Sequence, residues 1–239
     1  MIRRLIVTMM PAVLVGTSPS NPAFAQEKVV SEPSSAIGQI VCVSGQHSMT
    51  TTATVIEDRS SLLTVSHFNY DHRSRSSIAE SNCSFILRSE NGTIEFRSSF
   101  KVATRGARGA DIAFSRATDW AVLKLTTPVD QQVEPVIVAF DHDTSQGSEV
   151  SLKGYQGRLR QIVERKNCRP TARSAGSAIL DHSCRTSPGL SGEPLFAQTA
   201  DGLRLVAIHS ARDGDQGLAV LIKGFAARSI RRRNSAEVS

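Results

Sequence analysis

The chain has 239 residues, and its 28 lysines and arginines against 22 acidic residues give a formal net charge of +6 at neutral pH. Beyond residue 25 there is no apolar run of the roughly 18 residues that a membrane-spanning helix needs, so we expect no stable membrane insertion of the mature protein. The 214 residues beyond that point (239 − 25) are enough for one all-β domain.

The N-terminal segment predicts an export signal. Met1–Arg4 is positively charged, Leu5–Gly16 is mostly apolar but too short to span a bilayer, and Ala23-Phe24-Ala25 fits the small-x-small cleavage pattern. The short apolar stretch disfavours the alternative, an N-terminal membrane anchor. We therefore expect residues 1–25 to be a signal peptide and residues 26–36 to be a flexible segment or a short propeptide. The mature protein is then periplasmic or secreted in a bacterium.

Short apolar segments recur along the rest of the chain, separated by turn sequences such as Glu90-Asn91-Gly92 and Asp201-Gly202. This spacing predicts a sandwich or a barrel. Residues 72–82 and 104–117 are expected as surface loops, and residues 223–233 as a short closing helix. The predicted strands are 38–43, 51–57, 61–66, 83–88, 93–97, 120–125, 134–140, 149–153, 158–163, 194–198, 203–208 and 217–222.

Two apolar segments carry residues suited to acid–base chemistry. Residues 61–66 lead into His67, and Asp119 stands immediately before the apolar run 120–125. Histidine is a base whose ordinary pKa of about 6.5 lies near neutral pH, and a buried carboxylate can hold its ring in one tautomer. Asp111 is a rival for the carboxylate, but polar residues interrupt the apolar run behind it.

A third segment, Gly189-Leu190-Ser191-Gly192-Glu193-Pro194, presents a serine between glycines. A serine hydroxyl becomes a useful nucleophile when a base takes its proton and N–H groups stabilise the resulting oxyanion. Gly189 has no Cβ, so its N–H can point to a reacting carbonyl oxygen. Alone, the segment is also compatible with a plain glycine-rich turn. The order His67, Asp119, Ser191 favours the catalytic interpretation.

These segments resemble the motifs of the chymotrypsin-like (trypsin-like) serine peptidases. Residues 64–67, Thr-Val-Ser-His, are similar to the family's Thr-Ala-Ala-His. Residues 119–125, Asp-Trp-Ala-Val-Leu-Lys-Leu, are similar to Asp-Ile-Ala-Leu-Leu-Lys-Leu, and residues 189–194 to Gly-Asp-Ser-Gly-Gly-Pro. The resemblance covers roughly residues 37–230. It implies two six-stranded antiparallel β-barrels with the active site in the cleft between them, followed by a short helix.

The resemblance also implies a function. The chain would be a serine endopeptidase, a cofactor-free monomer that cleaves protein or peptide substrates through an acyl-enzyme. His67 would be the general base, Asp119 its orienting partner and Ser191 the nucleophile, with the N–H groups of Gly189 and Ser191 as the oxyanion hole. His67 and Asp119 would come from the first barrel and Ser191 from the second.

Two residues depart from the family pattern. Leu190 replaces the aspartate that, in animal enzymes, receives the amino group freed by zymogen cleavage, and Phe68 replaces a cysteine after the histidine. Both departures point to the compact bacterial branch, and neither removes a catalytic group. The alternative function is a catalytically inactive binding protein of the same fold. A quality-control protease with a PDZ domain is disfavoured, because 48 residues follow Ser191 (239 − 191).

Residues 206–211 are expected to wall the S1 pocket. They resemble the Gly-Ile-His stretch of bacterial glutamyl endopeptidases, whose histidine contacts the acidic side chain of the substrate, and Thr186 matches a threonine beside it. His209, Thr186 and Ser210 are therefore expected to bind substrate and to favour glutamate at P1, with added charge from Arg185. The alternatives are a histidine bonded only within its strand and a broader specificity.

Four cysteines in an exported chain predict two disulfides. Of three possible pairings we favour Cys42–Cys83, which ties the strand before the predicted base to the strand after it, and Cys168–Cys184, which braces the wall leading to the serine loop. No metal site is expected, because the chain lacks Cys-x-x-Cys and His-Glu-x-x-His patterns.

The C-terminal tail, residues 231–239, begins with three arginines. Clustered arginines are compatible with nucleic-acid binding. We favour a solvated helix end instead, and expect no nucleic-acid partner.

Overall fold

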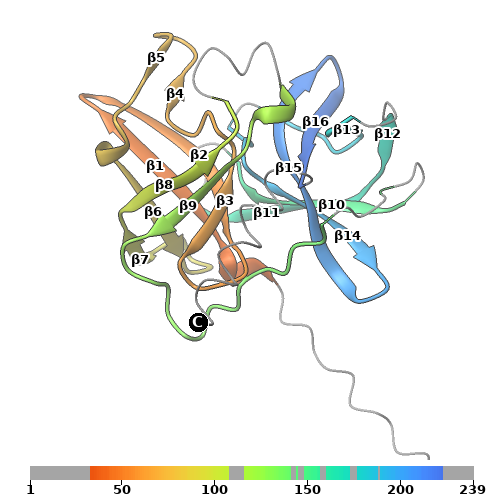
Figure 1. Ribbon diagram of the computed structural model, residues 1–239, viewed down its shortest axis with the longest axis horizontal. Coiled ribbons are helices and arrows are strands. Elements are labelled where there is room, and N and C mark those ends of the chain that lie inside the picture. Colours follow the sequence, from red (N-terminus) through yellow and green to blue (C-terminus); the bar gives the residue numbers. More distant parts are fainter. Residues whose placement is uncertain are drawn as a thin grey trace, which may run out of the picture. The chain divides into compact units, whose positions relative to one another are not determined.

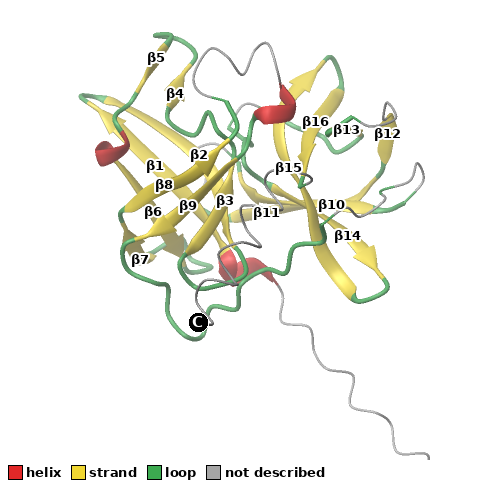
Figure 2. Cartoon of the chain, in the orientation of Figure 1, coloured by secondary structure: helices red, strands yellow, loops and turns green. Residues whose placement is uncertain are grey.

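The computed structural model of the chain describes residues 33–107, 116–140, 144, 148–156, 160–172, 177–187 and 189–222. Within these ranges the strands form two seven-stranded sheets and one two-stranded hairpin, joined by loops and short 3-10 turns (Figures 1 and 2). The expected all-β class is confirmed. None of the helices in these ranges has the length and apolar character needed to cross a membrane. The predicted signal peptide, closing helix and basic tail lie outside the described residues, as does Asp111.

The first sheet has the strand order β7-β6-β1-β2-β3-β9-β8, and β1 and β2 form an antiparallel hairpin within it. Its apolar side chains fill the interior; Ile40, Leu62, Phe85 and Leu123 are fully buried. A short 3-10 turn, η1 (Pro33–Ala36), precedes it. The strands are β1 (Ile37–Ser44), β2 (His47–Val55), β3 (Ser61–Thr64), β6 (Cys83–Arg88), β7 (Ile94–Ser98), β8 (Phe100–Arg105) and β9 (Ala121–Leu125).

The second sheet follows the order β11-β10-β14-β15-β16-β13-β12. The turn predicted at Asp201-Gly202 joins two of its strands, and Gly202 has φ of +100°, which glycine adopts without the strain a Cβ would cause. The strands are β10 (Val150–Tyr155), β11 (Ile162–Cys168), β12 (Pro170–Ala172), β13 (Ile179–His182), β14 (Pro194–Thr199), β15 (Gly202–Asp213) and β16 (Gln216–Leu221).

Each sheet curls into a barrel because its two edges are consecutive parts of one bent segment. In the first sheet, β7 pairs with β6 and β8 with β9, although only Ser99 separates β7 from β8. In the second, β11 pairs with β10 and β12 with β13, and only Arg169 separates them. Seven paired strands thus correspond to the six expected per barrel when the bent segment is counted once.

The predicted strand 158–163 is misplaced, because the strand there, β11, begins only at Ile162, and the predicted strand 134–140 is wrong. This segment makes only single bridges, from Val136 to Ile56 of the first barrel and from Val138 to Leu205 of the second. It therefore runs between the two sheets and belongs to neither. Its alternating apolar residues are buried by contact with both barrels, which a sequence pattern cannot distinguish from burial within one sheet.

Hydrogen bonds and a shared core fix the two barrels against each other. The N–H of Thr52, on β2, donates to the carbonyl of Ser191 at 2.9 Å, and its hydroxyl accepts the N–H of Tyr155 at 3.2 Å. The larger apolar core extends from the first barrel to Phe196 and Ile208 of the second. The serine loop is therefore anchored to the opposite barrel.

Both disulfides have the favoured pairing. Cys42 of β1 and Cys83 of β6 stand opposite each other in the sheet register and are bonded. Cys168 at the end of β11 is bonded to Cys184, two residues beyond β13. The second bridge therefore joins the edge strand of the barrel to the segment that leads into the serine loop.

Candidate active site

The first sheet brings His67 and Asp119 together. Strands β3 and β9 are antiparallel, with Thr64 opposite Ala121, so the end of one strand lies beside the start of the other. His67 follows β3 and Asp119 precedes β9. Their side chains meet at 2.8 Å between Nδ1 of His67 and Oδ2 of Asp119. Both residues are buried, with 8% of the histidine and none of the aspartate exposed.

The Asp119 carboxylate is held by donors on every side. Oδ1 accepts the backbone N–H groups of Ser66 at 3.0 Å and His67 at 3.2 Å, and the hydroxyl of Ser210 donates to Oδ2. Burial raises the pKa of this carboxyl, but the neighbouring His67 and the hydrogen bonds from His67 and Ser210 outweigh burial, so the pKa lies below its ordinary value. Asp119 is therefore an ionised, fixed acceptor for Nδ1–H of the imidazole.

Phe68 replaces the expected cysteine with apolar packing. Its fully buried ring packs edge-on against Phe100, with ring centroids 5.6 Å apart, and the guanidinium of Arg105 lies 5.5 Å from its centroid. Arg105 in turn forms an ion pair with Glu80. The residue after the predicted base is thus anchored without a disulfide at that position.

The Ser191 turn is clamped by backbone hydrogen bonds. The N–H of Glu193 donates to the carbonyl of Leu190 at 3.2 Å, and Gly192 and Glu193 exchange bonds of 2.8 Å with His209 of β15. Gly192 has φ of +84°, and a Cβ there would collide with the Thr52 carbonyl. The tight turn requires glycine at this position.

Ser210 connects Ser191 to the predicted carboxylate, Asp119. Its carbonyl accepts the Ser191 hydroxyl at 3.4 Å while its own hydroxyl donates to Asp119. Among the described residues, no hydrogen bond joins Ser191 Oγ to the His67 ring. The Ser210 hydroxyl is engaged with the Asp119 carboxylate, and substrate binding by Ser210 stays a prediction.

The expected oxyanion donors lie on the same turn. Gly189 has φ of +94°, a conformation that favours glycine. Within the described part of the chain, the N–H groups of Gly189 and Ser191 have no acceptor. Two N–H groups on one tight turn are suited to bind a developing oxyanion.

His209 is paired with a second buried histidine that sequence reasoning missed. Strand β16 lies between β13 and β15, and the ring of His182 passes over Gly217, where a Cβ would collide with it. Nε2 of His182 lies 3.2 Å from Nδ1 of His209. Burial lowers the pKa of His182 to about 4; burial and then the neighbouring His182 lower the pKa of His209 to about 3. Both rings are therefore neutral at neutral pH.

The other expected pocket residues are more open. Thr186 is half-buried on the segment before the serine turn, and Arg185 beside it is exposed. A hairpin of β4 (Tyr70–Asp71) and β5 (Ser76–Ser77) follows His67 and brings His72 to its ring, with centroids 5.5 Å apart. Burial and the nearby His67 lower the pKa of His72.

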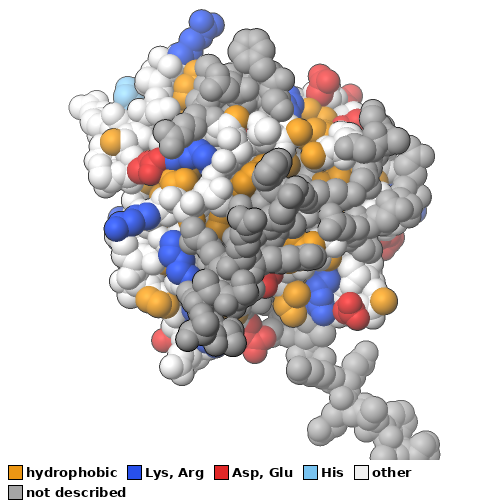
Figure 3. All heavy atoms as spheres, in the orientation of Figure 1, with side chains coloured by type: hydrophobic (Ala, Val, Ile, Leu, Met, Phe, Trp, Pro, Cys, Tyr) orange, Lys and Arg blue, Asp and Glu red, His pale blue; other side chains and the backbone are white. Residues whose placement is uncertain are grey.

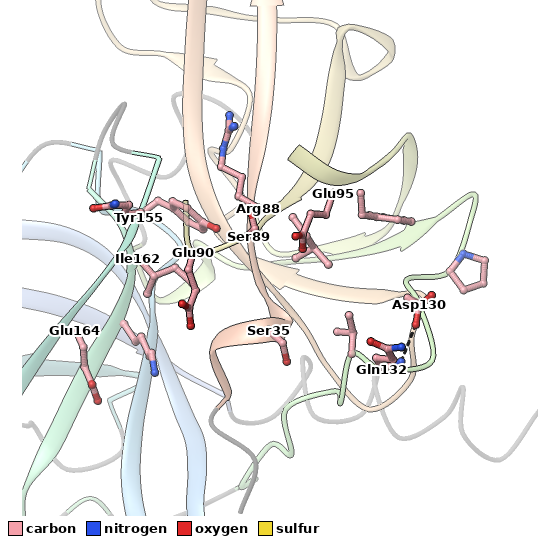
Figure 4. Close-up of a pocket in the computed structure, with 16 residues that line it drawn as sticks. Ser35, Arg88, Ser89, Glu90, Glu95, Asp130, Gln132, Tyr155, Ile162 and Glu164 are labelled. Atoms are coloured by element: carbon pink, nitrogen blue, oxygen red, sulfur yellow. Dashed lines mark hydrogen bonds between the residues drawn. The ribbon is translucent and has the colours of Figure 1, made fainter. Parts of the chain in front are cut away.

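One cavity lies away from these residues. It measures about 1090 Å³, and none of the predicted catalytic residues lines it (Figure 4). Its walls carry charges of both signs, including Arg88, Glu90, Glu95, Lys153 and Glu164. Basic and acidic side chains are also interspersed on the face drawn in Figure 3. Among the described residues, no group of three or more histidine, cysteine or acidic side chains is placed to hold a metal ion.

No family model and no curated protein sequence matches the chain. Solved structures do. A thermostable serine protease, AL20, from an extremophilic microorganism superposes with a TM-score of 0.67 at 19% identity, covering 84% of this chain and 98% of that one. A Glu endopeptidase superposes with a TM-score of 0.64 at 18% identity, covering 85% of this chain and 92% of that one. The Rv3671c protease of M. tuberculosis superposes with a TM-score of 0.59 at 15% identity, covering 92% of this chain and 93% of that one. The chain therefore has the double-barrel fold of the chymotrypsin-like serine proteases.

Proposed function

We propose that the chain is a serine endopeptidase in which Ser191 is the nucleophile, His67 the general base and Asp119 the carboxylate that orients it. The observation that carries this proposal is the bond between His67 Nδ1 and the buried Asp119. It keeps the proton on Nδ1, so the lone pair of Nε2 is available to accept the serine proton. The double-barrel fold shared with known serine proteases supports the same reading.

In this mechanism Ser191 Oγ attacks the substrate carbonyl carbon while its proton passes to Nε2 of His67. The carbonyl oxygen becomes an oxyanion and accepts the N–H groups of Gly189 and Ser191. The imidazolium, stabilised by Asp119, then gives its proton to the leaving amine, and an acyl-enzyme remains. Water, deprotonated by the same histidine, releases the acid product and restores the serine.

The test is covalent labelling. The mature protein should react with a fluorophosphonate and hydrolyse peptides, and Ser191→Ala should lose both while keeping the wild-type unfolding transition. Ser183→Ala, an exposed serine eight residues earlier on the same segment (191 − 183), is the matched control and should still be labelled. Equal labelling of the Ser191→Ala protein would contradict the proposal, and failure of the wild type to react would favour an inactive binding protein.

We further propose that the histidine pair selects glutamate at P1. The neutral His182 donates Nε2–H to Nδ1 of His209, which leaves Nε2–H of His209 as a donor to a substrate carboxylate. The half-buried hydroxyl of Thr186 supplies a second donor. The likeness in fold to a Glu endopeptidase supports this choice.

Kinetics on matched substrates tests the pocket. Losing one hydrogen bond to a charged group costs roughly 1.5–3 kcal/mol, about ten- to a hundred-fold in kcat/KM. His209→Ala should show this loss on a glutamyl substrate and a much smaller one on the leucyl analogue. Equal losses on both would make His209 a structural residue.

We also propose that the protein is exported from the cytoplasm. The signal pattern of residues 1–25 and the two disulfides both fit an oxidising compartment outside the cytoplasm. N-terminal sequencing of protein secreted or released from the periplasm of a bacterial host should give Gln26 as the first residue. Full-length protein retained in the cytoplasm would contradict it.

A further inference from the structure

A buried acid lies directly behind the serine turn. Glu193 follows Ser191 by two residues, where the family motif has glycine, and its side chain is fully buried. Strand β10 makes room for it, because a Cβ on Gly154 would collide with the Glu193 side chain. Burial raises the pKa of the Glu193 carboxyl and the guanidinium of Arg165 opposes that rise. A charge in such a place needs a partner to be tolerated.

Arg165 of β11 is that partner, and it is also the centre of a longer row of hydrogen-bonded side chains. Its Nη1 lies 3.1 and 3.4 Å from the two carboxylate oxygens of Glu193, and its Nη2 donates to Oε1 of Gln156 at 3.4 Å. The amide of Gln156 donates in turn to the hydroxyl of Ser187 at 3.4 Å. Ser187 precedes Ser191 by four residues and Glu193 follows it by two, so this chain of side chains spans the turn from one side to the other.

The two halves of the turn are held differently. Residues 190–193 are fixed by backbone bonds to one another, to Thr52 and to His209. For residues 185–187 and Gly189, the described residues supply no backbone hydrogen bond. The contact of Ser187 with Gln156 is the tie on that side. Gly189 lies between the two halves and carries one of the expected oxyanion donors.

We propose that Arg165 is a positioning residue, which through Glu193 on one side and Gln156 and Ser187 on the other holds the turn that presents the oxyanion donors. This rests on the proposed serine endopeptidase function. Leu190 stands where animal relatives have the aspartate that receives the freed amino group, so that contact is not available to this turn. Here the tie is built from side chains within the second barrel.

Three variants separate positioning from folding. Arg165→Met/Glu193→Gln removes both charges together and leaves no unpaired buried ion. Gln156→Ala keeps the ion pair and cuts only the link to Ser187. Lys166→Met is the control, because Lys166 is the next residue on β11, its side chain is exposed, and it pairs with Glu164 at 3.2 Å. Each protein is assayed for kcat and KM on a peptide substrate and for binding of a peptide aldehyde, whose adduct places an oxyanion in the site.

Removal of a single oxyanion donor costs about 10²–10³-fold in kcat in well-studied serine proteases. A turn that is displaced but keeps both donors should lower kcat by less than the loss of one donor does. We therefore expect about a ten- to hundred-fold loss of kcat in the double variant, and a smaller loss in Gln156→Ala. KM should change by less than about three-fold, aldehyde affinity should fall in parallel with kcat/KM, and Lys166→Met should match the wild type. Unchanged kcat in both test variants, or a rise in KM alone, would overturn the positioning role.

Hydrogen exchange of the backbone amides of residues 185–191 measures how firmly the turn is held, and it does not depend on activity. Faster exchange in the double variant and in Gln156→Ala than in Lys166→Met is the expected result. Equal exchange in all three would overturn the inference. An inactive wild type would refute the proposed function instead, and exchange would still decide whether Arg165 holds the turn.

Discussion

The buried histidine pair makes a quantitative prediction about acid stability. In the folded protein the pKa of His182 is about 4 and that of His209 about 3, both lowered by burial. In the unfolded chain both should return to about 6.5. Above pH 6.5 the rings are neutral in both states and the full stability is present. As pH falls below 6.5, the unfolded state binds protons that the folded state cannot, and stability is lost until pH reaches the folded pKa values.

The magnitude follows from the same values. Each histidine contributes a slope of about 1.4 kcal/mol per pH unit once the unfolded form is protonated and the folded form is not. Between pH 7 and pH 5 this amounts to about 2 kcal/mol per histidine and about 4 kcal/mol for the pair. A typical domain has only about 5–15 kcal/mol of stability, so the effect is large enough to measure.

Urea unfolding at pH 7, 6 and 5 measures it. The wild type is compared with His182→Asn/His209→Asn, because acidic groups such as Asp119 contribute the same pH dependence to both proteins. The difference in unfolding free energy between the two should change by about 4 kcal/mol over this range, with the wild type losing more on acidification. Parallel pH dependence in the two proteins would refute the assignment of neutral buried rings.

Three further outcomes are expected. Asp119→Asn should lower kcat by about 10³–10⁴-fold with little change in KM, because the wrong imidazole tautomer is then favoured; a change confined to KM would contradict this. Ser210→Ala should lower kcat by about ten-fold at unchanged KM, since it removes a donor to Asp119 and keeps the carbonyl that faces Ser191, whereas a rise in KM would return the hydroxyl to substrate binding. Non-reducing peptide maps should link Cys168 to Cys184, and a link from either to another cysteine would be incompatible with the structure.

Local sequence patterns predicted the strands whose burial follows from their own composition. The run 61–66 became β3 leading to His67, and the segment after Asp119 became β9, because each is rich in apolar residues and buried at nearly every position. The segment 134–140 misled, because its alternation reflects contacts with two different barrels. Alternation reports which side chains are buried, and it does not report what buries them.

The missed residues share one cause. His182 lies on a four-residue strand, and its partner is 27 positions away, across β16. Arg165 and Glu193 are 28 positions apart. A lone histidine or arginine in a strand carries no signal of such a contact. The one available hint was Glu193 itself, an acid where the family motif has glycine, because a charge in a tight buried turn requires a partner elsewhere in the barrel.

The proposed chemistry depends on the registration of the two barrels as much as on its three residues. The base and its carboxylate belong to the first sheet, and the nucleophile belongs to a turn of the second. Thr52 fixes that turn through its N–H, and Ser210 reaches back from the second barrel to the Asp119 carboxylate. Ser210 and Asp119 are separated by 91 positions, so this contact forms only when both barrels are folded and docked. Because the proposed base and its carboxylate lie on the first barrel and the proposed nucleophile lies on the second, partial separation of the barrels would abolish catalysis.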